Sequence, residues 1–138
     1  FKILQENLKE YKNIDFRLKG IGDRKEKMFL SECTASSSAN TLGSEEGIEV
    51  SMTTLDDDID EPLTLIKADI EGFEQKAIIG AKNHIFNNHP KLLISVYHNN
   101  EDLWKIPKMI NNISDNYKFY LRYKSSPIYP TEITLIAI

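Results

Sequence analysis

The fold is decided by residues 63–98, which read LTLIKADIEGFEQKAIIGAKNHIFNNHPKLLISVYH. Two apolar runs, at 63–68 and 92–96, have the length and composition of buried strands. Between them, apolar residues recur every fourth position, the spacing of one helix face: Phe73, Ala77, Ala81 and Ile85. The segment 87–90 (NNHP) ends that helix. The stretch therefore predicts a strand, a helix and a second strand parallel to the first.

Upstream of this unit the pattern is less regular. Apolar spacing over residues 1–12 predicts an amphipathic helix, and alternation predicts strands at 15–19 and 48–54. Residues 27–30 are expected to be a short extended piece. The segment 33–46 is rich in Ser, Thr, Ala, Asn and Gly, which is typical of a surface loop with a functional role.

Downstream of the unit we expect one more helix and two strands. The helix carries Ile106, Ile110 and Ile113 and is expected to begin near Pro107, because proline is disfavoured in a helix interior. Strands at 118–123 and 133–138 are joined by a turn at 125–127. The whole order predicts an α/β fold with a parallel sheet, helices on both faces and an antiparallel strand at the end.

Composition limits the classes of function. The 138 residues suffice for a single domain, and a net charge of −4 argues against a nucleic-acid backbone as the main partner. No apolar run is long enough to span a membrane. Cys33 is the only cysteine, so the chain has neither an intrachain disulfide nor a structural zinc site, and it suits the reducing cytoplasm.

Ligands of open α/β sheets collect at the carboxyl ends of the strands. Three polar segments are expected there, 20–23, 69–72 and 97–98. Asp69 is either a helix cap or a functional carboxylate, and spacing alone leaves both interpretations open. Glu71 has a capping explanation at the start of the helix. His98 is either a solvated loop histidine or a general base near neutral pH.

Other known binding and catalytic motifs are excluded, because residues that they require are absent. Asp56, Asp58 and Asp60 imitate a calcium loop, but its sixth position is Glu61 and its twelfth is Lys67. The pair Gly20 and Gly22 lacks the third glycine of a dinucleotide motif. The sequence contains no phosphate-binding Walker loop, no nucleophile elbow and no metal-spaced Cys/His cluster, so we predict no metal site.

The order of these features resembles the FkbM methyltransferase family. The resemblance rests on TLDD at 54–57, IKADIEGFE at 66–74, Gly80-Ala81 and the proline-led strand at 90–98. The tail contributes matches at 102–107, 117–122 and 132–134, so the likeness covers nearly the whole chain. Its most specific part is the Lys-x-Asp-x-Glu-Gly core, residues 67–72.

The resemblance implies a class I methyltransferase (Rossmann-like) sheet, mostly parallel with a C-terminal antiparallel strand. It implies methyl transfer from S-adenosylmethionine to a hydroxyl of a sugar or natural product. Asp69 would face the cofactor's sulfonium and the acceptor, and His98 would be the general base. Asp23 would bind the adenine amino group. Glu71 and Arg122 would help bind the acceptor, and an ion pair between Arg122 and Glu132 is an equally good interpretation of those two positions.

The resemblance also implies that the sheet is incomplete. A complete family member opens with a strand, a glycine-rich turn and a second strand ending in an acid, whereas this chain begins at Phe1 in the expected next helix. We therefore interpret residues 1–138 as one truncated methyltransferase domain and expect it to bind S-adenosylmethionine poorly by itself.

Two other classes stay open on the sequence. A non-catalytic α/β interaction module derived from the same fold is the main alternative. A nicotinamide-dependent oxidoreductase would have a purely parallel end to its sheet, whereas 118–138 predicts a terminal strand pair.

Overall fold

The computed structural model describes residues 1–30, 42–44, 47–123 and 132–138, and for 42–44 the backbone alone. The helices are α1 (Lys2–Asn7), α2 (Leu55–Asp58), α3 (Glu74–Gly80), α4 (Lys82–Asn88) and α5 (Asp102–Ile113). The strands are β1 (Gly20–Ile21), β2 (Glu26–Leu30), β3 (Leu42–Ser44), β4 (Ile48–Thr53), β5 (Leu65–Ala68), β6 (Lys91–Ser95), β7 (Phe119–Tyr123) and β8 (Ile133–Ala137).

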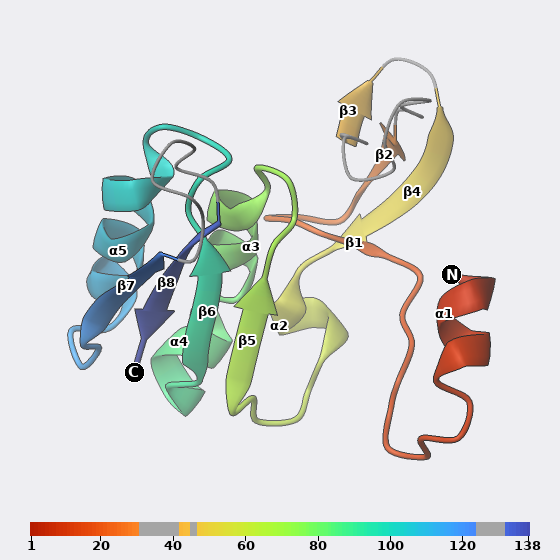
Figure 1. Cartoon of the computed structure of the whole chain (residues 1–138), viewed down its shortest axis with the longest axis horizontal. Coiled ribbons are helices and arrows are strands. Elements are labelled where there is room, and N and C mark those ends of the chain that lie inside the picture. The colour runs from red at the N-terminus through yellow and green to blue at the C-terminus, as the bar shows by residue number, and fades with distance from the viewer. Residues whose placement is uncertain (31–41, 45–46, 124–131) are drawn as a thin grey trace.

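The strands form two sheets of four (Figure 1). The first has the order β1-β4-β2-β3 and the second the order β5-β6-β8-β7. The pairs β1–β4 and β5–β6 are parallel, and the other pairs are antiparallel. The predicted strand–helix–strand unit is confirmed as β5, α3–α4 and β6, and the antiparallel C-terminal pair is confirmed as β7 and β8. The α/β fold class is therefore confirmed, with an incomplete sheet.

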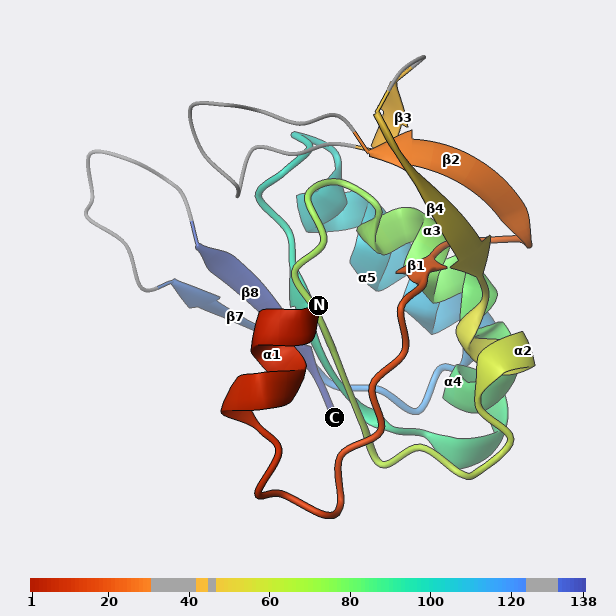
Figure 2. The ribbon, with the colours of Figure 1, turned by 90° about the vertical axis from the view of Figure 1, so that its right-hand side faces the viewer.

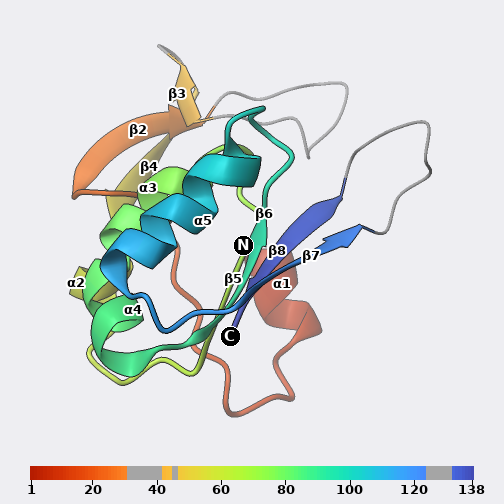
Figure 3. The same cartoon turned by 90° about the vertical axis from the view of Figure 1, so that its left-hand side faces the viewer.

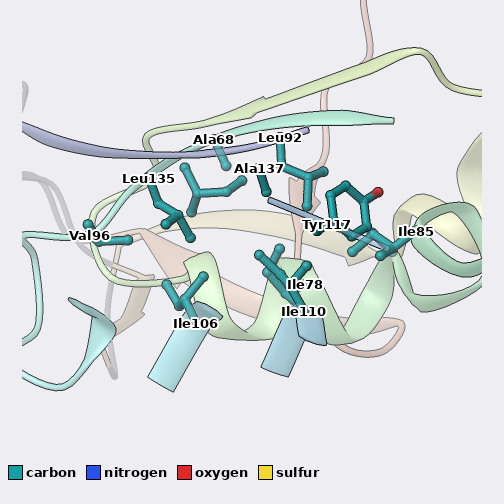
Figure 4. Close-up of a cluster of buried hydrophobic side chains, with 12 residues drawn as sticks. Ala68, Ile78, Ile85, Leu92, Val96, Ile106, Ile110, Tyr117, Leu135 and Ala137 are labelled. Atoms are coloured by element: carbon teal, nitrogen blue, oxygen red, sulfur yellow. The ribbon is translucent and has the colours of Figure 1, made fainter. Parts of the chain in front are cut away.

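The core lies between the second sheet and the helices α3, α4 and α5. These helices gather on one face of that sheet (Figures 2 and 3). Alternate strand residues point toward them, and Figure 4 shows their side chains meeting those of the helices. The buried set is Ala68, Ile78, Ala81, Ile85, Leu92, Ile94, Val96, Ile106, Ile110, Tyr117, Leu135 and Ala137. Helices α3–α5 share this single face, whereas α1 is drawn on the opposite side of the sheet and has no buried residue (Figures 2 and 3). The expected second layer of packed helices is therefore not formed within the described part of the chain.

Strand β5 lies at the edge of its sheet, although its apolar sequence predicted a buried central strand. Among the described strands it pairs only with β6, and Leu65 is 51% exposed. Its outer edge borders a pocket of about 230 Å³ whose lining includes Ile21, Leu55 and Ile66. A strand whose sequence suits two neighbouring strands thus has one within the part of the chain that the structure describes.

Three helices differ from their predicted bounds, and the first, expected over 1–12, ends at Asn7. The helix expected over 73–86 is divided at Ala81 into α3 and α4, and His89 ends α4 in a left-handed conformation (φ 46°), as the NNHP segment indicated. Helix α5 begins at Asp102 and contains Pro107, rather than beginning near it. Buried Asp102 accepts the backbone N–H of Asn99, which fixes the chain entering the helix five residues before the proline.

The strand expected at 15–19 is wrong, since this segment is not a strand and pairs with none of the described strands. Its cations bind α2 instead: the Arg17 and Lys19 side chains both contact the Asp58 carboxylate. The first strand is only Gly20–Ile21. Most of the loop expected at 33–46, with Cys33, and the turn expected at 125–127 lie outside the described residues.

We expect Asp58→Asn to lower the free energy of unfolding by about 1 kcal/mol at neutral pH, a small amount because Lys19 and Arg17 are over 40% exposed and screened by water. The hydrogen bond from Lys19 lowers the pKa of Asp58 below its ordinary 3.8, and the charges of Lys19 and Arg17 add to this. A lowered folded-state pKa stabilises the fold above the ordinary value, and the effect disappears as pH falls through the folded-state value. Urea unfolding at neutral and acidic pH measures this, with Asp57→Asn as the control. If Asp58→Asn lost the same free energy of unfolding, relative to the parent, at both pH values, the ion pair would be contradicted.

Candidate active site

The turn between β5 and α3, residues 69–72, forms one wall of the candidate site. Glu71 and Gly72 both have positive φ angles, 54° and 96°. This conformation costs energy for a residue with a side chain such as Glu71, and such strain persists only where the surroundings enforce it. The enforcing group is the Glu74 carboxylate, which is fully buried: Oε1 accepts the Ile70 N–H at 2.8 Å and Oε2 accepts the Gly72 N–H at 3.0 Å.

His98 approaches the same carboxylate from the end of the neighbouring strand. The parallel register aligns Ala68 with Ile94, so the chain segments that follow β5 and β6 emerge side by side. His98 Nδ1 lies 2.9 Å from Glu74 Oε1. An ionised carboxylate can only accept hydrogen bonds, so a neutral ring paired with it would carry its proton on Nδ1 and donate it. Glu74 thus joins the turn and the histidine.

The other ring nitrogen of His98 faces the predicted acids. Nε2 is 3.6 Å from Asp69 Oδ1 and 3.5 Å from Glu71 Oε2, distances too long for hydrogen bonds. The ring is 10% exposed, and Nε2 is buried with no hydrogen-bond partner among the described residues. Asp69, Glu71 and His98, which the sequence placed at neighbouring strand ends, therefore lie together around this unpartnered ring nitrogen.

Two residues of this group were not predicted as functional. Tyr97 donates its hydroxyl to Asp69 Oδ1 at 3.1 Å, and burial, assisted by the charge of Asp69, raises the pKa of Tyr97. Glu74 is the second. In the sequence it has the appearance of an ordinary acid in the first turn of a helix, and only its burial distinguishes it.

A pocket of about 250 Å³ opens beside Asp69 on the sheet face away from the helices. Ser95, Thr134 and Arg122 occupy one row across β6, β8 and β7 and line it. Tyr97 and Glu132 complete the lining. Arg122 therefore lies near Asp69, as an acceptor-binding residue should. The alternative, an ion pair between Arg122 and Glu132, is not among the salt bridges of the described residues.

Asp23 lies in the loop between β1 and β2 and does not line this pocket. Its Oδ1 is buried without a hydrogen-bond partner among the described residues, while Oδ2 is 3.9 Å from Arg24 Nη1. A buried carboxylate oxygen without a donor is costly unless a ligand supplies one. The adenine amino group of S-adenosylmethionine is a donor of the required kind, so this residue fits the cofactor.

The carboxylates also raise the question of a cation. Ligand atoms of Asp69, Glu74 and His98 lie within 4.8 Å of one another, and this set of oxygen and nitrogen donors suits a divalent metal. However, both Glu74 oxygens already accept backbone N–H groups. We therefore interpret the group as a proton-transfer site rather than a metal centre.

Within the described residues, no helix has the length and apolar character needed to cross a membrane.

Comparison with known proteins agrees with the geometry. The family described as the methyltransferase FkbM domain matches residues 7–122. No curated protein matches the chain. The crystal structure of methyltransferase FkbM from Methylobacillus flagellatus KT is similar, with a TM-score of 0.75 and 26% sequence identity. The match covers 99% of this chain and 33% of that one, so this chain spans about a third of the length of its solved relative. With the family matched over most of its length, the chain belongs to the FkbM methyltransferase family.

Proposed function

We propose that the protein transfers a methyl group from S-adenosylmethionine to a hydroxyl group of a sugar or natural product. The observation that supports this best is the buried Nε2 of His98, which has no hydrogen-bond partner among the described residues and two carboxylates 3.5–3.6 Å away. A hydroxyl is a weak nucleophile and needs a base to take its proton during methyl transfer, more than an amine does.

When bound, S-adenosylmethionine supplies a methyl group already activated by the positive sulfur. The chain must then hold the acceptor oxygen in line and remove its proton. His98 Nε2 takes that proton and becomes an imidazolium. Asp69 and Glu71 are near enough to stabilise the new charge, and Glu74 does so through Nδ1. Asp69 also presents a negative charge that suits the sulfonium.

The pocket beside Asp69 suits a polar acceptor. Ser95, Thr134 and Arg122 offer hydroxyl and guanidinium donors along one wall, and Asp69 and Glu132 offer acceptors. A molecule with several hydroxyl groups would match such a lining. The net charge of −4 and the lone cysteine support a small-molecule acceptor in the cytoplasm over a nucleic acid.

The activity test uses the full-length gene product with S-adenosylmethionine and a panel of hydroxylated sugars and natural products. Mass spectrometry should detect an acceptor heavier by one methylene unit, together with S-adenosylhomocysteine. Cofactor binding without transfer to any hydroxyl, but with transfer to an amine, would reject the hydroxyl acceptor. Neither binding nor transfer would favour a non-catalytic interaction module.

We expect residues 1–138 alone to bind S-adenosylmethionine more weakly than micromolar. The reason is that we assign only two residues of this polypeptide, Asp23 and Asp69, to cofactor binding. In addition, β5 has no second neighbouring strand among the described residues. Isothermal titration calorimetry on this polypeptide and on the full-length product measures the difference. In the full-length product, Asp23→Asn should weaken binding by about tenfold, the effect of losing a hydrogen bond to a charged group. Micromolar binding by residues 1–138 would contradict the expectation.

A further inference from the structure

The buried carboxylate of Glu74 has three partners and no exposed surface. It accepts N–H groups from Ile70, Gly72 and His98, so its negative charge is fully enclosed by donors. A buried carboxylate that merely capped α3 would need only the backbone donors. The third partner, the His98 ring, connects Glu74 to the base of the proposed reaction.

We propose that Glu74 is a positioning residue that sets the tautomer and orientation of His98. This inference rests on the proposed function, because it assigns the device that prepares the proposed base. With the proton of the neutral ring held on Nδ1 by Glu74, the lone pair must lie on Nε2. Nε2 is the nitrogen that faces Asp69 and Glu71.

The same carboxylate also shapes the opposite wall of the site. Its bonds to the N–H groups of Ile70 and Gly72 hold the turn in which Glu71 has a positive φ of 54°. Asp69 and Glu71, which lie on this turn, are thereby placed beside Nε2. One buried group thus fixes both the base and the acids that stabilise its protonated form. The charged groups facing the ring are Asp69, Glu71 and Glu74, and Tyr97 packs on it with ring centroids 4.2 Å apart.

The informative variant is Glu74→Gln, which keeps the size and removes the charge. An amide has one acceptor oxygen, whereas the carboxylate positions at Glu74 face three N–H donors. If the amide nitrogen takes the Oε1 position, it faces the ring and the Ile70 N–H, so Nδ1 must become the acceptor and the proton moves to Nε2. If it takes the Oε2 position, it opposes the Gly72 N–H and the turn that carries Asp69 and Glu71 loosens, while the oxygen still accepts from Nδ1. The first arrangement reverses the tautomer, and the second displaces the acids beside Nε2.

Asp102→Asn is the matched control. Asp102 is also fully buried, and it accepts hydrogen bonds from Asn99 and Gln75, but it has no contact with His98 among the described hydrogen bonds and salt bridges. Both substitutions neutralise a buried carboxylate at equal size. Both variants are expected to be less stable than the parent. A change of the His98 tautomer or of kcat that occurs only in Glu74→Gln therefore reports the effect of Glu74 on the histidine.

The test combines nitrogen NMR of His98 with kinetics of the full-length product. In the parent, measured above the pH at which the ring loses its charge, we expect the proton on Nδ1. Glu74→Gln should shift the population toward Nε2–H and lower kcat by about tenfold or more, as losing a tautomer-holding carboxylate does elsewhere. Asp102→Asn should leave the tautomer unchanged.

A parent ring with its proton on Nε2 would overturn the proposal even if Glu74→Gln failed to fold. So would a Glu74→Gln protein with parental tautomer and kcat. If the parent showed the expected tautomer but no methyl transfer to any acceptor, the positioning role would stand and the proposed function would fail, so the two results are distinguishable.

Discussion

Replacing His98 with alanine in the full-length product is expected to lower kcat by about 10²- to 10⁴-fold, the usual contribution of a general base. The reason is the position of Nε2, buried beside Asp69 and Glu71 with no hydrogen-bond partner to give up when it takes the acceptor's proton. KM for S-adenosylmethionine should change little, because the ring acts on the acceptor. The difference in kcat between His98→Ala and the parent should become smaller at high pH, where hydroxide can remove the same proton.

His89→Asn is the control for this experiment. His89 bonds to Ser114 at the end of α4, in a left-handed conformation that asparagine tolerates, and it belongs to no part of the candidate site. It should keep the parental kcat. Steady-state kinetics across pH, with a hydroxyl acceptor identified by mass spectrometry, measure both variants. Turnover by His98→Ala equal to that of the parent at every pH would remove the histidine as the base.

Gly80→Ala is expected to destabilise the protein by about 3 kcal/mol, at the upper end of the cost of overpacking. A Cβ built on Gly80 would lie 2.1 Å from the backbone oxygen of Gly22 and 3.1 Å from Thr54 Cβ. The carbonyl of Gly22 is itself held in place, because the Gly22 N–H donates to Thr53. Backbone cannot move aside as a flexible side chain can, so α3 and the β1 segment would separate.

The sign of this effect makes the test decisive. Helix propensity alone favours alanine over glycine by about 1 kcal/mol, so a position without close contacts would be stabilised. Urea unfolding of Gly80→Ala measures the sign. Ile79→Ala, a 50% exposed neighbour on the same helix, should change stability by less than about 0.5 kcal/mol. In Gly20→Ala the new Cβ meets the flexible end of Met52, so the cost should be smaller. A stabilised Gly80→Ala protein would contradict the close approach.

The close approach of Gly80 to Gly22 also connects α3 to the segment that carries Asp23. Gly22 precedes Asp23, the residue whose Oδ1 is buried without a partner, so a displaced β1 segment would move the candidate adenine contact. Weaker binding of S-adenosylmethionine by a folded Gly80→Ala full-length product would follow from the same cause. Gly80 is part of the family resemblance, yet nothing in its sequence neighbourhood indicates that its partner is the backbone of residue 22.

The arrangement of Asp69, Glu71 and His98 was predictable because short-range rules determine it. An apolar run ending at Asp69 and another ending near His98, separated by one helix, must form parallel neighbours, and the carboxyl ends of parallel neighbours meet. The helix end at His89 was equally local, since Asn, His and Pro in succession stop a helix wherever it lies.

The errors occurred where a distant segment decides the outcome. Residues 15–19 alternate like a strand, but a strand needs a partner, and here Arg17 and Lys19 bind Asp58, some 40 positions away. The apolar sequence of β5 indicates only that the strand can be buried between two neighbours. In the described sheet β5 lies at the edge and has one neighbouring strand, β6.

The sequence by itself thus determined the α/β unit, the family and the strand ends that carry the site. Only the tertiary structure decided that Glu74 is buried between the Asp69–Gly72 turn and His98, and that Gly80 packs on Gly22. The physical reason is the sequence separation over which each interaction acts. Periodicity and turn chemistry act between residues a few positions apart, whereas the environment of a carboxylate or a glycine depends on whichever part of the chain packs against it.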